Sequence, residues 1–179
     1  MPKPPYVAPL PQNGHWTITL NSVAQTDKER VPATIDTIKT GETKQVTLLY
    51  KDGTSQRFNH AGGYIFTQSS KGVEIFTKLP GIPAYPCYTD GFVFVENIGP
   101  AVFKDMAKIS GTECFHYQTG SSDVWIAVDS MLPVAARSGN LTAYYQFQPP
   151  PTAPIALPPE EAAILRKWEK AYNAFGAMR

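Results

Sequence analysis

The alternation of apolar and polar side chains with a period of two is the feature that most constrains the fold of this chain. It appears first where Trp16, Ile18 and Leu20 alternate with threonine residues. Further segments of the same kind follow, and the turn at Asp52-Gly53 is a strong signal for a β-hairpin. The other predicted strands cover residues 45–51, 57–60, 63–68, 73–78, 92–95, 113–118, 123–129 and 141–147. We therefore expect a mainly β protein built as an antiparallel meander, without alternating βαβ units.

Two segments depart from this alternation, and the sequence predicts a helix for each. The first, residues 100–109, begins with a proline and spaces its apolar side chains along one side of a short amphipathic helix. The second, residues 159–175, has Glu160 and Glu161 at its positive end and is followed by Gly176. Its apolar stripe consists of Ile164, Leu165, Trp168, Tyr172 and Phe175. We expect this stripe to pack on the sheet; the alternative is a helix that covers an apolar groove.

The prolines mark the two ends of the predicted β structure. Eleven of the 17 prolines lie in residues 2–11 and 149–159, where they favour extended conformations and exclude central strands. These stretches are typical of spacers along a surface, and the alternative is a recognition motif for a protein partner. The predicted organisation is a Pro-rich arm (1–13), an antiparallel β domain (14–148), a Pro-rich linker (149–158) and a C-terminal helix (159–176).

The composition excludes several classes of protein. The chain of 179 residues is 42% hydrophobic and 17% charged, which is typical of one globular domain with a core of its own. Its net charge of +1 and scattered basic residues argue against nucleic-acid binding through phosphate neutralisation. No apolar stretch approaches the length of a membrane span, and no export signal is present in this numbering. From the residues alone, the protein is either cytosolic or exported after removal of a signal.

No common catalytic motif occurs in the sequence. Signatures of serine hydrolases, nucleotide-binding loops, zinc proteases and dinucleotide-binding folds are all missing, so we predict no cofactor and no enzymatic activity. The acidic residues Asp123, Asp129, Glu160 and Glu161 stand at the ends of predicted elements, where we expect them to be solvated.

One cluster, Cys114-Phe115-His116, carries residues capable of thiol or metal chemistry. Thiol and imidazole two residues apart share one face of a strand, and with Cys87 they would supply three zinc ligands or a Cys–His nucleophile pair. Alternatively, a Cys87–Cys114 disulfide would stabilise the fold by roughly 3 kcal/mol. A third interpretation is two buried thiols that act as small apolar side chains. Of these, we expect the disulfide rather than a thiol or zinc enzyme that uses Cys114 and His116.

Aromatic side chains make up 12% of the chain and are spread through the predicted strands. An antiparallel sheet with large side chains on both faces needs either two coverings or one covering and one groove. The residues leave two interpretations open: a filled core with the helix packed on it, or an apolar ligand groove under the C-terminal helix. The candidate lining residues are Trp16, Phe92, Phe94, Trp125, Tyr145, Phe147 and Trp168.

The late hairpin, residues 111–147, resembles the corresponding region of the LolA/LolB-like periplasmic lipoprotein carriers. Trp125-Ile126 and Leu132-Pro133 match that family's pattern, with Gly111 and Tyr117 upstream, whereas Ala127 stands where the family often has Asp. The resemblance implies a strongly curved sheet, an incomplete barrel that holds lipid or acyl chains. It also implies a periplasmic or secreted, non-enzymatic protein that binds an apolar ligand or a lipidated partner. The alternative function is a structural or interaction protein whose core is filled and whose Pro-rich arms make the contacts.

Overall fold

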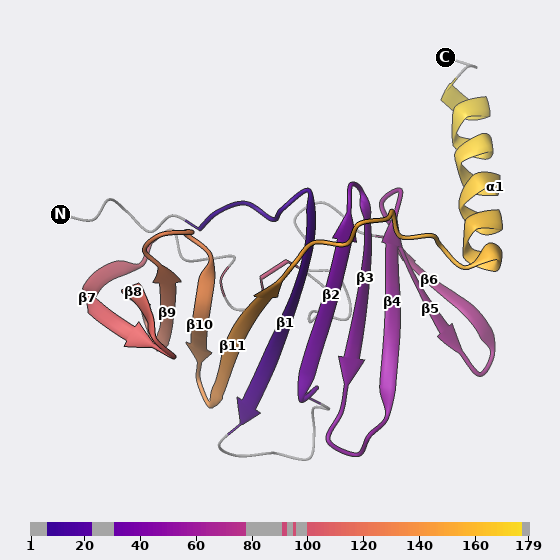
Figure 1. Ribbon diagram of the computed structural model, residues 1–179. Helices are drawn as coiled ribbons and strands as arrows, with labels where there is room; N and C mark the ends of the chain where they lie inside the picture. The colour runs from indigo at the N-terminus through magenta and orange to yellow at the C-terminus, as the bar shows by residue number, and fades with distance from the viewer. Residues whose placement is uncertain (1–6, 23–30, 78–90, 93–94, 96–99, 177–179) are drawn as a thin grey trace.

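The computed structural model describes residues 7–22, 31–77, 91–92, 95 and 100–176, and this part of the chain forms one antiparallel sheet and one helix (Figure 1). The sheet has eleven strands in the order β6-β5-β4-β3-β2-β1-β11-β10-β9-β8-β7. In chain order the elements are β1 (Asn13–Ser22), β2 (Thr34–Thr40), β3 (Thr43–Leu49), β4 (Ser55–Ala61), β5 (Tyr64–Ser69), β6 (Gly72–Thr77), β7 (Val102–Ile109), β8 (Thr112–Thr119), β9 (Ser122–Ala127), β10 (Pro133–Ser138), β11 (Leu141–Gln148) and α1 (Pro159–Gly176).

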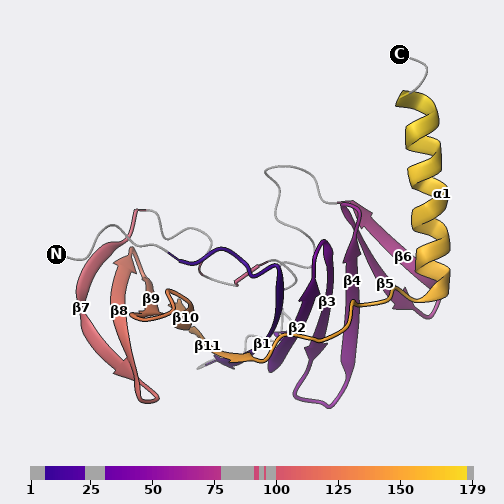
Figure 2. The ribbon, with the colours of Figure 1, turned by 45° about the horizontal axis from the view of Figure 1, so that its top comes forward.

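The first and last strands meet in the middle of the sheet. Trp16 of β1 lies opposite Phe147 of β11 on one side and opposite Thr37 of β2 on the other. The sheet bends into an open half-barrel, with β6 and β7 as its two free edges (Figure 2). The sheet is not closed, so the expectation of a mainly β, strongly curved and incomplete barrel is confirmed.

The inner face of the half-barrel is apolar. Because side chains alternate between faces, the cross-strand registers place a large set of apolar residues on this face, together with the buried Thr37 and Thr67. The buried members are Trp16, Ile18, Leu20, Ile35, Val46, Leu48, Phe58, Ile65, Tyr117, Val124, Ile126, Ala136, Ala143 and Tyr145. Phe92, Val95 and Ala101, which lie between β6 and β7 in the chain, pack against them. The hydrophobic core of the molecule therefore lies within the curve of the sheet.

The outer face is polar where the middle strands cross it. The carboxylate of Asp36 is 2.8 Å from Nε2 of His15 and accepts a hydrogen bond of 3.1 Å from Oγ1 of Thr17. The side-chain amide of Gln148 donates to Thr17 Oγ1 at 3.0 Å, which joins β11 to this group. These polar side chains occupy the positions between the core residues, so one face of the sheet can remain solvated.

The helix predicted over residues 100–109 is wrong, because this segment is the edge strand β7. Ser110 and Gly111 both have positive φ (49° and 88°) and form a two-residue turn that returns the chain along β7 as β8. A register shift between Phe103 and Asp105 interrupts the alternation, which explains why the apolar spacing resembled that of a helix. The strand predicted over residues 92–95 is not observed at Phe92 or Val95, and the two residues between them lie outside the described part.

The predicted C-terminal helix is present as α1, and it packs on the outer face of the sheet with its first half (Figure 2). The linker before it crosses the ends of several strands, where the backbone N–H of Ile155 donates to Thr40 Oγ1 at 2.9 Å (Figure 1). Trp168 meets the ring of Tyr64 edge-on at a centroid distance of 4.9 Å. One turn later, Tyr172 is 78% exposed, so the apolar stripe continues past the sheet. Within the described residues, no helix is both long and apolar enough to span a bilayer.

Candidate functional site

Four of the predicted lining residues form an aromatic cluster on the inner face. Phe92 lies in the centre, with ring centroids 5.6 Å from Trp16, 5.7 Å from Phe147 and 6.1 Å from Tyr145. Trp16 and Phe147 are themselves 6.4 Å apart. The three contacts of Phe92 are edge-to-face, the geometry that aromatic pairs favour. Four of the seven residues proposed from the sequence as groove lining are therefore in contact, although they come from distant parts of the chain.

A pocket of about 460 Å³ opens at the rim of the half-barrel, beside this cluster. It forms where β10 pairs with β11 only from Ala135 onward, so that Pro133 and Val134 have no register partner in β11. The lining residues are Ile109, Ser110, Thr112, Ala127, Asp129, Ser130, Leu132, Pro133, Val134, Tyr144, Tyr145, Gln146 and Phe147. Its volume falls within the range of pockets that bind small ligands. Tyr145 and Phe147 belong to both the pocket and the aromatic cluster.

Two of the predicted lining residues lie on the opposite face. Trp125 stacks on the imidazole of His116 at a centroid distance of 4.8 Å, on the outer face. Trp168 belongs to α1 and contacts Tyr64 there. Phe94 lies outside the described residues. The correction for Trp125 follows from its position between Val124 and Ile126, both buried on the inner face, because neighbours in a strand point in opposite directions.

Among the described residues Cys114 has no disulfide partner, and its side chain is completely buried. Its Sγ donates to the carbonyl oxygen of Thr112 at 3.4 Å, and burial raises the pKa of the thiol. A raised pKa reduces the thiolate fraction at neutral pH, so this thiol is a poor nucleophile. Cys87 lies outside the described residues; the Cys87–Cys114 disulfide is not shown and stays a prediction.

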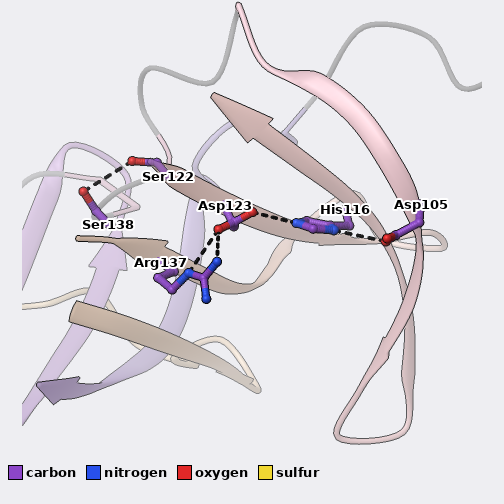
Figure 3. A network of polar contacts seen from close by, with 6 residues as sticks. All are labelled: Asp105, His116, Ser122, Asp123, Arg137 and Ser138. Atoms are coloured by element: carbon purple, nitrogen blue, oxygen red, sulfur yellow. Dashed lines mark hydrogen bonds and ion pairs between the residues drawn. The ribbon is translucent and has the colours of Figure 1, made fainter. Parts of the chain in front are cut away.

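The imidazole of His116 is engaged by two carboxylates (Figure 3). Nδ1 lies 3.0 Å from Asp105 Oδ1, and Nε2 lies 2.9 Å from Asp123 Oδ1. On the other side of Asp123, Nε of Arg137 donates to Oδ2 at 3.0 Å, and Nη2 of Arg137 contacts the same oxygen. The network joins β7, β8, β9 and β10 across the outer face.

Asp123 is the buried centre of this network. Burial alone raises the pKa of its carboxyl group, but the hydrogen bonds and charges of His116 and Arg137 outweigh that effect and lower the pKa. The expectation that Asp123 is a solvated strand end is therefore wrong. The alternation of side chains could have predicted its surroundings, because Asp123 lies on the same face as Trp125. Arg137 is its register partner in β10.

Glu161 corrects the same expectation at the start of α1. Its side chain is buried, and Oε2 accepts a hydrogen bond of 2.9 Å from Nδ2 of Asn59. Asn59 in turn accepts a bond of 3.1 Å from the amide of Gln45. Burial raises the pKa of Glu161, and the neighbouring charge of Glu160 adds to that effect, against the lowering by Asn59 and Arg57. Sequence reasoning missed Glu161 because two adjacent acidic residues at a helix start are usually exposed.

The described residues contain no group of three or more His, Cys, Asp or Glu side chains that could hold a metal ion. The polar side chains of the outer-face network instead pair with one another. They are Asp105, His116, Asp123 and Arg137. The candidate site therefore consists of an apolar inner face and a rim pocket, and the hydrogen-bonded network around Asp123 lies on the outer face.

The described fold is similar to that of the lipoprotein LppX of Mycobacterium tuberculosis, with a TM-score of 0.51 over 82% of this chain and 90% of that chain, at 13% identity. The chain therefore shares its overall fold with this lipoprotein. The curved, incomplete barrel that the resemblance over residues 111–147 implied is the architecture observed.

Two further structures share less of the geometry. They are LprF of Mycobacterium bovis, at TM-score 0.41 and 11% identity over 82% of this chain and 88% of that one, and a LolA superfamily protein of Nitrosomonas europaea, at TM-score 0.38 and 6% identity over 83% and 90%. No protein-family model and no curated protein matches the sequence.

Proposed function

We propose that this protein is an exported, non-enzymatic protein that binds an apolar ligand, or the acyl chains of a lipidated partner, within its half-barrel. The observation that carries the proposal is the largely apolar inner face of a sheet that is not closed. A sheet of this size ordinarily buries its apolar face against other elements, and here Phe92, Val95 and Ala101 cover part of it. An apolar chain that displaces these residues would cover the same face without creating buried polar groups.

The carrier-like fold and the rim pocket support the same proposal. The similar structure LppX is a lipoprotein, and a fold of this kind supports export to a compartment outside the cytoplasm. Tyr145 and Phe147 line both the rim pocket and the margin of the apolar face, so the pocket offers an apolar ligand a route of approach. Cys114 and His116 have separate partners, Thr112 on one side and two aspartates on the other, which supports a non-enzymatic role.

A second candidate function, a protein-interaction module with a filled core, is favoured by the edge strand β7. Val102 and Met106 on this strand are 63% and 53% exposed. Such a strand has backbone groups available for pairing with a strand of another protein. The packing of Phe92 into the aromatic cluster is compatible with this function, because it fills part of the inner face.

Native mass spectrometry of the full chain, followed by organic extraction, separates the two candidates. Purified protein is mixed with phospholipid vesicles, reisolated and weighed in its native state. We expect added mass that is recovered as lipid in the organic phase. An unchanged mass at every lipid concentration, with a protein partner captured through β7, would contradict ligand binding and support the interaction module.

A further inference from the structure

Trp16 carries a polar atom that the apolar inner face leaves without a partner. Its side chain is completely buried, and its Nε1–H has no hydrogen-bond acceptor among the described residues. A buried donor without an acceptor is unfavourable, and native structures pair most such groups. An additional oxygen atom beside this indole would therefore be favourable.

The contacts of the indole show which end of the ring carries this donor. A methyl group at Gly14 would lie 3.3 Å from Cζ3 of Trp16 and 2.6 Å from Cγ of Pro11, so the benzene edge of the indole points toward the start of β1. Nε1 lies at the other end of the ring system, away from Gly14. Phe92 and Phe147 flank the indole, and Phe147 also lines the rim pocket.

The surroundings of Trp16 favour a neutral oxygen acceptor. The nearest inner-face neighbours across the sheet are Phe147 in β11 and Thr37 in β2, neither of which carries a charge. A carboxylate buried beside them would lose its hydration without gaining a cation, whereas an ester carbonyl would gain a donor at little cost. A pure hydrocarbon would leave Nε1 unpaired.

We propose that Trp16 is a ligand-recognition residue, whose indole N–H donates to the carbonyl oxygen of a neutral acyl ester while the acyl chain lies along the inner face. This inference rests on the proposed function and specifies the class of its ligand. Trp125 and Trp168, on the outer face, have no part in it.

The test compares two probes with the same chain length, methyl palmitate and hexadecane, by displacement of a fluorescent apolar dye from the full chain. Wild-type protein is expected to bind the ester roughly three- to tenfold more tightly, the value of one hydrogen bond. Trp16→Phe should abolish this preference and leave hexadecane binding unchanged, whereas Trp125→Phe and Trp168→Phe should retain the preference. Palmitic acid in its ionised form should bind more weakly than the ester.

A second measurement guards against a fold defect in the Trp16→Phe protein. Replacing tryptophan by benzothienylalanine, in a Trp125→Phe/Trp168→Phe background, exchanges the N–H of Trp16 for sulfur and keeps the shape of the ring. Loss of the ester preference in this protein supports the proposal. Equal binding of both probes by the wild type, or an equal loss for both probes in the variants, would overturn it and leave the proposed function standing. Failure of the wild type to bind either probe would overturn both.

Discussion

The side-chain amide of Asn59 in β4 donates a hydrogen bond of 2.9 Å to the carboxylate of Glu161 in the first turn of α1. Both side chains are 3% exposed, so the C-terminal helix is attached to the outer face through a buried polar contact. This contact, the ring pair of Trp168 and Tyr64 and the approach of Leu165 to Gly62 together hold the first half of the helix. The attachment leads to three predictions about helix docking.

Removal of the Glu161 carboxyl group should destabilise the fold. In Glu161→Ala the amide of Asn59 loses its acceptor, and we expect a loss of about 1–3 kcal/mol in the free energy of unfolding. Glu161→Gln keeps an oxygen acceptor and removes the buried charge, so it should be at least as stable as the wild type at neutral pH. Urea unfolding measures both effects. Glu160→Gln is the matched control, because it removes an exposed charge from the same helix turn.

The raised pKa of Glu161 also predicts how stability depends on pH. Its pKa is higher in the folded than in the unfolded state, so the folded protein binds more protons in the interval between the two values. The stabilisation from Glu161 is therefore complete below the unfolded pKa and is lost as the pH rises through the folded pKa. The unfolding free energy of Glu161→Gln should lack this decline, and identical pH profiles for the two proteins would contradict the assignment.

A side chain at Gly62 should strain both the turn and the helix contact. Gly62 has φ +57° and its Cβ would lie 2.9 Å from Cδ1 of Leu165, whereas Gly41 has φ +56° and no neighbour within 4 Å. Gly41→Ala should cost about 1–2 kcal/mol through the left-handed backbone alone. Gly62→Ala should cost an additional ~0.5–1.5 kcal/mol, because Leu165 must leave its preferred rotamer. In a Leu165→Ala background the two glycine substitutions should cost the same amount of unfolding free energy.

The lowered pKa of Asp123 predicts sensitivity to acid. Its folded pKa lies below the unfolded value of about 3.9, so the unfolded state binds more protons in that interval. The stabilisation from Asp123 is present above the unfolded pKa and is lost as the pH falls through the folded pKa. Asp123→Asn should flatten this part of the stability curve, measured by urea unfolding between about pH 2 and pH 5. Glu113→Gln, an exposed carboxylate change in β8, should leave the curve unaltered.

The buried thiol of Cys114 should react slowly in the folded protein. Since burial raises its pKa and excludes solvent, we expect little alkylation by iodoacetamide at neutral pH in a Cys87→Ser protein. Complete alkylation should follow in urea, as measured by intact mass. Rapid labelling under native conditions would contradict the burial of this side chain. The predicted disulfide is tested with the wild-type chain, alkylated in urea without a reducing agent. Two alkyl groups in the intact mass mean free Cys87 and Cys114, and none means a disulfide between them.

Local sequence determined the elements whose signals are contained within a few residues. Alternation placed Trp16, Ile18 and Leu20 on one face, and Asp52-Gly53 lies in the turn between β3 and β4. The C-terminal helix was predictable because its opening proline, acidic first turn and terminal glycine act over single turns. These signals depend only on backbone conformation and on residues a few positions away. They therefore do not depend on which other elements pack nearby.

Only the tertiary structure decided which of these elements meet and what they bury. Residues 102–109 have apolar spacing suited to a helix, and pairing with β8 made them a strand because the ladder satisfies the backbone groups. Phe92 joins Trp16 and Phe147, and Glu161 reaches Asn59, across separations that no local pattern encodes. The burial of Asp123 and Glu161 likewise depends on partners brought by other strands. Sequence periodicity fixes the face on which a side chain lies, whereas the curvature and order of the sheet determine its partners.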